Sequence, residues 1–267
     1  RVDAPLNDKQ TNRIEINTGA RRTSGRLNID QTIGEKFTVS GGVDFTHSFV
    51  QNGIGNNDNA GISSTYALGY TPAIYDLQQI DPTTGQLIKM FMNGGGTGTV
   101  NPFDAFPNIT NNEDTWRQTA SLRLGYSLLS GTHNTVQLAY IGGVDRFQLE
   151  GTQYSPGRLQ FEAADGFLGT AQVLNNDSRF INQSVNAVWT FTPTWKFWNS
   201  AQTSVGGTYE TQKSNGYQLR ARGLLPTRTV ATQAGSTDFS ASQSIEEFRD
   251  QSMYVNEQLI LLDEKLA

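Results

Sequence analysis

Apolar and polar residues alternate with a period of two over unusually long stretches of this chain. Between Lys36 and Phe49, the odd positions carry mostly apolar side chains, including Phe37, Val39 and Phe45, and the even positions are polar or glycine. A period of two places alternate side chains on opposite faces of a β-strand. The run is far longer than the roughly five or six residues of a typical soluble strand. The pattern predicts a long strand with one apolar and one polar face.

Other segments repeat this alternation. The clearest are 116–128, 181–191 and 195–209, and the weaker ones are 22–30, 135–148 and 251–262. In each segment one parity, meaning either the odd or the even positions, carries apolar side chains, and the other parity carries Ser, Thr, Asn, Gln or charged side chains. The sequence therefore predicts an all-β fold of about seven long strands.

The expected connections alternate between short and long. Short turns are expected near 32–35, 129–134, 192–194 and 263–264, and long irregular segments at 50–115, 149–177 and 211–250. Compact soluble domains seldom contain structureless loops beyond ~12–15 residues. Transmembrane β-barrels combine tight periplasmic turns with long extracellular loops, and their strands have an apolar lipid face and a polar lumen face. We therefore predict a partial antiparallel transmembrane β-barrel.

Aromatic residues gather around the short turn that contains Pro193. They are Trp189, Phe191, Trp195 and Phe197. Outer-membrane barrels carry aromatic girdles at both bilayer interfaces, so we interpret this group as part of a girdle. The alternative is a local hydrophobic cluster that caps a soluble sandwich.

Composition narrows the functional classes. The chain has 267 residues, a net charge of -5 and no cysteine, and its charged fraction is 17%. The acidic balance argues against a nucleic-acid partner. The lack of cysteine excludes disulfides and thiolate metal sites, and the two histidines, His47 and His133, are too few for a histidine-based metal site without carboxylate ligands. No run approaches the ~18 apolar residues of a transmembrane helix.

Catalytic motifs are also missing, so we expect no enzyme activity, no catalytic residue, no metal and no cofactor. The Gly94–Gly98 run lacks the lysine of a phosphate-binding loop, and the segment 52–61 lacks the spacing of a calcium loop. The adjacent carboxylates Glu113–Asp114 and Glu246–Glu247 are interpreted as solvated charges at loop ends. Some aromatic and basic residues are expected in the long loops: Tyr66, Tyr70, Tyr75, Tyr154, Tyr217, Arg220, Arg222 and Arg228.

Arginines on the polar parity are the candidate functional residues. An Arg on the lipid face at mid-membrane would cost ~2–4 kcal/mol, so parity directs these side chains to the lumen. There they could contact a plug or an anionic substrate, or pair with wall carboxylates such as Asp30 and Asp44. The lumen-facing candidates are Arg22, Arg26, Arg117 and Arg123, together with Trp198.

Three stretches resemble a known family, the SusC/RagA-type TonB-dependent outer-membrane transporters. The first is Asn17-Thr18-Gly19 followed by Arg21–Asp30 and the strand start Glu35–Gly41. The second is Gly142–Arg146 with Tyr154-Ser155-Pro156, and the third is Tyr254–Ala267. These are barrel-strand patterns and not catalytic signatures.

The resemblance implies energised nutrient uptake across the outer membrane of a Gram-negative bacterium. Residues 1–267 would form part of the TonB-dependent receptor β-barrel domain, with the plug domain and the C-terminal strands outside this chain. The implied partners are a SusD-like lipoprotein lid, the TonB complex acting through the plug, and outer-membrane lipid. The implied cargo is a glycan, a peptide or another large nutrient.

Two other functions remain open on the sequence. One is a soluble β-sandwich that binds carbohydrate, in which the apolar parity would be buried between two sheets. The other is a passive porin or adhesin barrel, which shares the strand pattern with a transporter. The arrangement of the sheet distinguishes the first alternative, because a barrel wall is one curved sheet with its apolar parity exposed.

Overall fold

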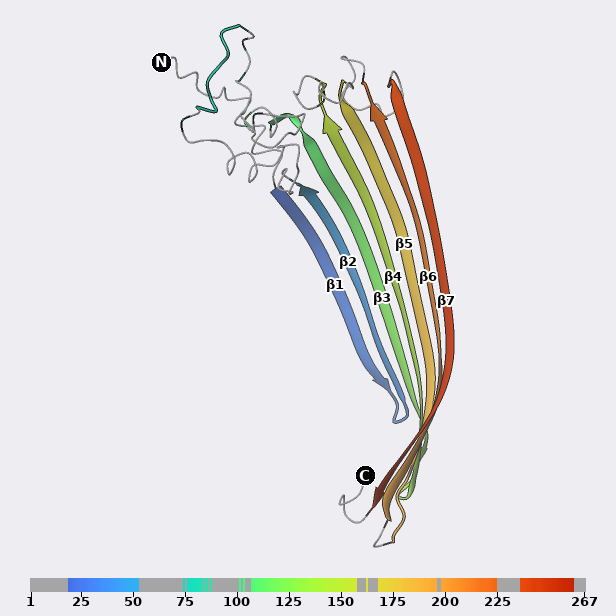
Figure 1. Ribbon diagram of the computed structural model, residues 1–267. Coiled ribbons are helices and arrows are strands. Elements are labelled where there is room, and N and C mark those ends of the chain that lie inside the picture. Colours follow the sequence, from blue (N-terminus) through green and yellow to red (C-terminus); the bar gives the residue numbers. More distant parts are fainter. Residues whose placement is uncertain are drawn as a thin grey trace.

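The seven strands of the protein form one antiparallel sheet in chain order, as Figure 1 shows. The computed structural model describes residues 19–52, 109–157, 168–195, 198–224 and 236–261, with Glu162 and single positions or short stretches between 74 and 108. The strands are β1 (Gly19–Ile33), β2 (Phe37–Gln51), β3 (Thr110–Ser130), β4 (Asn134–Ser155), β5 (Thr170–Phe191), β6 (Trp198–Arg222) and β7 (Asp238–Leu261). The predicted all-β fold with about seven long strands is confirmed.

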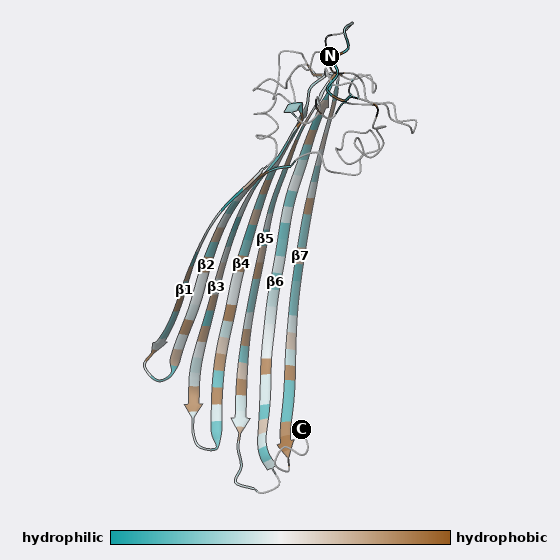
Figure 2. Cartoon of the chain, turned by 90° about the vertical axis from the view of Figure 1, so that its left-hand side faces the viewer, coloured by the Kyte–Doolittle hydropathy of each residue, from teal (hydrophilic) through white to brown (hydrophobic). Residues whose placement is uncertain are grey.

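The register assigns every strand residue to one of two faces, because directly opposed residues of antiparallel strands share a face. The row Val39, Leu124, Tyr140 and Val185 runs across β2 to β5 on one side. We call this side the apolar face. It carries the odd positions of β1, β2, β5, β6 and β7 and the even positions of β3 and β4 over most of their lengths. The opposite side is the polar face, and Figure 2 shows the resulting bands of high and low hydropathy along the strands.

The apolar face is exposed. Val43 is 52% exposed, Phe45 41% and Leu122 40%. Over the described residues, no second sheet covers these side chains. A small buried cluster of Ala171, Ala221 and Leu224, with Tyr154 against it, lies where β4, β5 and β6 meet the long connections. The two-sheet sandwich is therefore not the fold of the described residues.

Strands β3 to β7 extend further than the alternation predicts. The segments 149–177 and 211–250 were expected to be loops, but the connections are only 156–169 and 223–237. The reason is a stretch in each strand, such as 175–179 in β5 and 211–216 in β6, that carries polar side chains on both faces and so interrupts the alternation. The backbone pairs through this stretch, and beyond it apolar residues return at alternate positions, as in Val173 opposite Leu219.

Several residues expected in loops therefore lie in strands. Tyr154 is in β4, and Tyr217, Arg220 and Arg222 are in β6. The two carboxylate pairs lie within β3 and β7, where successive side chains point to opposite faces. The remaining expectations of this kind concern positions outside the described residues: Tyr66, Tyr70, Tyr75, Gly94–Gly98, Phe197, Arg228 and most of 52–61.

Short turns join β1 to β2, β3 to β4 and β5 to β6 at the end opposite the long connections, as predicted, and the fourth expected turn, 263–264, lies outside the described residues. The β1–β2 turn spans residues 34–36, and Gly34 has a φ of 63°, which a residue without Cβ adopts freely. Two register shifts lie close to this end, between Ser127 and Leu129 in β3 and between Trp198 and Ser200 in β6. We call this the short-turn end of the sheet.

Candidate functional site

Four predicted arginines share the polar face. The register places Arg22 and Arg26 of β1 and Arg117 and Arg123 of β3 on the same side of the sheet. Arg26 Nε donates to Asp44 Oδ2 at 3.2 Å, and the Arg117 guanidinium binds the Asp145 carboxylate with its shortest contact at 2.5 Å. The arginine–carboxylate pairing considered from the sequence therefore occurs at two of the four positions.

These pairs form a charged row with alternating signs. Arg26, Asp44 and Asp145 lie in one register row from β1 to β4, and Arg117 lies one row away beside them. Both arginines are largely solvated, with side-chain exposures of 69% for Arg26 and 57% for Arg117. Within the described ranges, no carboxylate binds Arg22 or Arg123. The row therefore contributes little net charge, and Arg22 and Arg123 are available to an anion on this face.

The polar face of β5 to β7 is built mainly from neutral hydrogen-bonding side chains. Ser214 donates to Asn176 at 3.0 Å, and Thr208 and Ser252 lie 2.5 Å apart across β6 and β7. Hydroxyl and amide groups both donate and accept hydrogen bonds. This half of the face can therefore bind water or polar solutes without selecting a charge.

Trp198 lies within a β-bulge, which interrupts the alternation that assigned it to the polar face. Its ring meets Phe191 edge-on at 5.9 Å and lies 5.5 Å from Trp195. Phe191 is on the apolar face. The lumen-facing position of Trp198 stays a prediction, and the bulge removes the parity argument for it.

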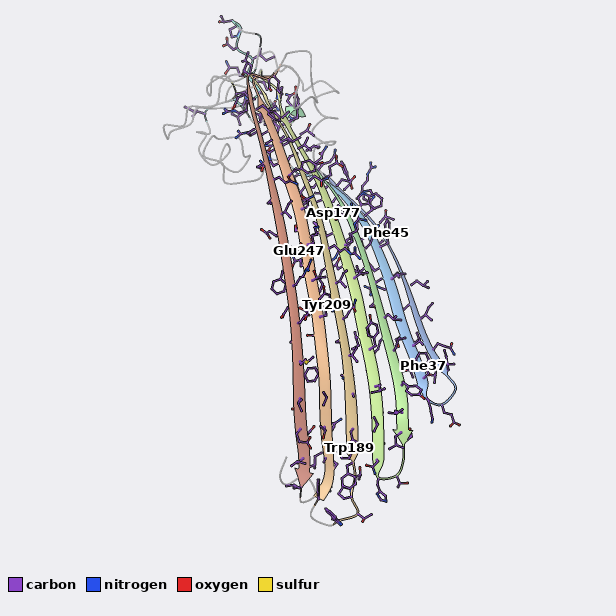
Figure 3. All side chains as sticks on the ribbon, turned by 90° about the vertical axis from the view of Figure 1, so that its right-hand side faces the viewer. Phe37, Phe45, Asp177, Trp189, Tyr209 and Glu247 are labelled. Atoms are coloured by element: carbon purple, nitrogen blue, oxygen red, sulfur yellow. The ribbon has the colours of Figure 1, made fainter. Side chains whose placement is uncertain are left out.

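Aromatic residues cluster on the apolar face at two levels, which Figure 3 marks by Trp189 and by Phe45, whose ring lies 5.3 Å from that of Trp116. At the short-turn end, Trp189 lies 6.2 Å from Phe191, and its indole donates to Asn134 at 3.1 Å. Further along the strands, His47 stacks on Trp116 at 3.8 Å and contacts Asp114 at 2.7 Å, although Asp114 was expected in a loop. Both groups combine an aromatic surface with a polar contact, as is typical of side chains at a membrane–water boundary.

Charged residues on the outer part of the apolar face were missed by the sequence analysis. Arg146 Nη2 donates to Asp177 Oδ2 at 2.8 Å, and Arg249 binds Glu247. Arg179 and Lys213 lie beside them on the same face. The sequence does contain a signal for them: continuing the alternation of the apolar segments outward along each strand assigns these charged residues to the apolar face.

The described residues hold no group of three or more His, Cys, Asp or Glu side chains placed to bind a metal. Nor do they include a helix long and apolar enough to cross a membrane.

No protein-family model matches the chain, and no curated protein matches it by sequence. Solved structures do match. Structures of the RagAB peptide importer in its closed-closed and open-open states align with TM-scores of 0.62 and 0.63, at 14% and 13% identity, over 91% and 92% of this chain. A RagAB peptide transporter structure aligns with a TM-score of 0.61 at 13% identity over 90% of this chain.

The chain corresponds to only 26% of the length of each of these RagAB chains. At such low identity, the likeness concerns the fold. The seven-stranded sheet, open at both edges, therefore has the fold of a partial β-barrel, a wall segment of the kind found in the RagAB peptide importer.

Proposed function

We propose that this chain is part of the barrel wall of a SusC/RagA-type, TonB-dependent importer in the outer membrane of a Gram-negative bacterium. The observation that carries the proposal is a single sheet of strands up to 25 residues long, with an exposed apolar face and the fold of a peptide importer's wall. In a bilayer, every backbone polar group needs a partner within the protein, so a sheet of this kind belongs in a closed barrel.

The two faces suit this role. The apolar face contacts lipid, with Trp189 and Phe191 near the periplasmic interface and His47 and Trp116 near the outer one. The polar face lines the lumen, where Arg22 and Arg123 are available to a plug or an anionic group of the cargo. The short turns face the periplasm and the long connections face the exterior, which is the usual asymmetry of outer-membrane barrels.

The cargo class is a large polar nutrient, either a peptide or a glycan. The support is the mainly neutral hydrogen-bonding wall of β5 to β7 and the likeness to the RagAB peptide importer. A SusD-like lipoprotein lid and the TonB complex complete the proposed assembly, and the plug and closing strands would come from the rest of the parent protein.

Uptake by the intact parent protein tests the proposal. The host strain, a strain lacking the parent protein and a strain lacking the TonB complex are each given labelled oligopeptides and oligosaccharides. We expect one cargo class to stop entering both deletion strains. Undiminished uptake without the TonB complex would favour a passive porin, and unchanged uptake without the parent protein would contradict a transport role.

A further inference from the structure

Cations occur on the apolar face at a common distance from the short turns. Arg146 is the twelfth residue after Asn134, where β4 begins, and Arg179 is twelve residues before Phe191, where β5 ends. In β6, Lys213 is twelve residues after Ala201, which is the register partner of Phe191. In β1, Arg21 is twelve residues before the strand end at Ile33. In β7, Arg249 is twelve residues before the strand end at Leu261. We call these five residues the cation belt: Arg21, Arg146, Arg179, Lys213 and Arg249.

Twelve residues place the belt just outside the bilayer core. A transmembrane strand crosses the hydrocarbon in about 9–11 residues at a tilt near 45°. Between the short turns and the belt, the described apolar face carries one carboxylate, Glu257, and it accepts a hydrogen bond from Thr203 at 2.5 Å. The belt therefore marks the outer boundary of the apolar band, at the level of the outer-leaflet headgroups. Figure 3 shows Asp177 and Glu247, which bind belt residues, far from Trp189 at the short-turn end.

The centre of the belt has an excess of positive charge. Arg146, Arg179 and Lys213 are directly opposed on the neighbouring strands β4, β5 and β6. Like charges directly opposite each other destabilise a sheet. Asp177 binds Arg146, and Glu247 stands opposite Lys213 but binds Arg249. Among the described residues, no carboxylate binds Arg179 or Lys213, so this pair is available to an external anion.

A hollow below the cations supplies the apolar half of a binding site. It has a volume of about 1060 Å³, and its lining includes Leu27, Val43 and Phe45, the three central cations and Asp177, which binds Arg146; the paired Arg26 and Asp44 of the polar face also reach its margin. A second hollow of about 610 Å³ shares Leu27, Val43 and Arg179 with it and continues over Ile29, Leu122 and Ile181. The combined surface is cationic at the outer end and apolar towards the short turns. It is therefore shaped for an amphiphile with an anionic head.

From this arrangement we infer that the central belt binds the phosphate groups of an outer-leaflet lipid, with the acyl chains lying along the two hollows. The inference rests on the proposed membrane location of the chain and adds a specific lipid contact to it. Arg guanidinium groups bind phosphate oxygens with two parallel hydrogen bonds, and a bound phosphate would relieve the repulsion between Arg179 and Lys213.

Lipid binding to the purified parent barrel tests the inference. Lipid A, and lipid A from which the phosphates have been removed, are titrated into the protein in dodecyl maltoside, and bound lipid is counted by native mass spectrometry. The test variant is Arg179→Gln with Lys213→Gln. The matched control is Arg26→Gln with Arg117→Gln, which removes two carboxylate-paired cations from the polar face, in the register rows on either side of that of Arg146. Heat-dependent gel mobility confirms that each variant is a folded barrel.

We expect the wild type and the control to bind phosphorylated lipid A alike. A cation near an anionic surface strengthens binding about fivefold, so the double variant should bind about 25-fold more weakly. Dephosphorylated lipid A should bind the wild type as weakly as intact lipid A binds the double variant. The inference would be overturned if the wild type bound both lipids equally, or if the double variant bound lipid A as tightly as the wild type. It would also be overturned if inorganic phosphate bound as tightly as lipid A.

The outcome is independent of the transport test. A parent protein that takes up its cargo but does not distinguish the two lipids contradicts the lipid contact alone. A folded barrel that selects phosphorylated lipid A but transports nothing contradicts the transport proposal alone. A parent protein that forms no barrel in membranes overturns both.

Discussion

The ring of Tyr254 in β7 lies over Gly206 in β6, and it occupies the space that a side chain at Gly206 would need. A Cβ placed on Gly206 would lie 2.5 Å from Tyr254 Cζ. The two residues are directly opposed on the polar face. An aromatic ring that covers a glycine on a neighbouring strand is a known device for fixing register.

Gly206→Val should therefore destabilise the parent barrel by about 1–3 kcal/mol, which is the usual cost of overpacking. Urea unfolding of the purified barrel measures this change. The control is Gly207→Val on the apolar face, where a Cβ would meet atoms no closer than 3.4 Å. Combining Gly206→Val with Tyr254→Ala should recover part of the loss. A full loss in this double variant would show that the ring is not the obstacle.

Adjacent positions in β5 test the assignment of the two faces. Val185 is 59% exposed on the apolar face, six residues from the end of the strand at Phe191, and Ser184 lies on the polar face. Val185→Arg should cost about 2–4 kcal/mol, because it places a charge in the hydrocarbon. Ser184→Arg should cost less than about 1 kcal/mol, since surface substitutions usually do. Unfolding of both variants in phospholipid vesicles measures the difference, and equal costs would contradict the assignment of the faces.

The Arg117–Asp145 pair should contribute a small, salt-sensitive coupling. Both side chains are solvated, so a double-mutant cycle with Arg117→Ala and Asp145→Ala should give about 0.2–1 kcal/mol, falling as ionic strength rises. The control cycle pairs Asp145→Ala with Arg123→Ala, because no carboxylate among the described residues binds Arg123. A coupling of similar size in the control cycle would mean that the energy does not come from this contact.

Gly34 should tolerate substitution less well than Gly25. Its φ of 63° is left-handed, which costs an ordinary residue about 1–2 kcal/mol. Gly34→Ala should therefore lower the free energy of unfolding by about that amount, and Gly34→Asn should cost less. Gly25→Ala serves as the control, because a Cβ there meets nothing within 4 Å and the backbone is that of a strand. Indistinguishable effects of alanine at the two positions would contradict the turn conformation.

The sequence was sufficient to predict the strands wherever one face is apolar. The segment around Phe37, Val39 and Val43 shows strict alternation, and it lies in β2 as predicted. It was not sufficient at the outer strand ends. Tyr217 and Arg220 lie beyond a stretch of β6, residues 211–216, that is polar on both faces, and backbone pairing with the neighbouring strands keeps that stretch extended. Such pairing leaves no hydrophobic period in the sequence of 211–216, so the expected strand ended too early.

The site was predicted in part for the same reason. Parity alone assigned Arg26 and Arg117 to one face, and Asp44 was expected among the carboxylates that pair with such arginines. Asp145 was not expected as a partner of Arg117. This pairing depends on the register between β3 and β4, and that register is determined by the turn and the bulge near Ser127. The bulge at Trp198 likewise shifts the parity by one residue, and nothing in the local composition announces it.

The outer edges of β1 and β7 remain unpaired along 15 and 24 residues in the described structure. Each edge presents a row of free backbone donors and acceptors, which is a template for any extended strand of suitable length. Separated from the rest of its parent, the segment would therefore be adhesive at both sides, and copies of it would stack edge to edge. Its hairpins are complete as local structures, but in the proposed barrel it is the covering of these two edges by further strands that would prevent such self-association.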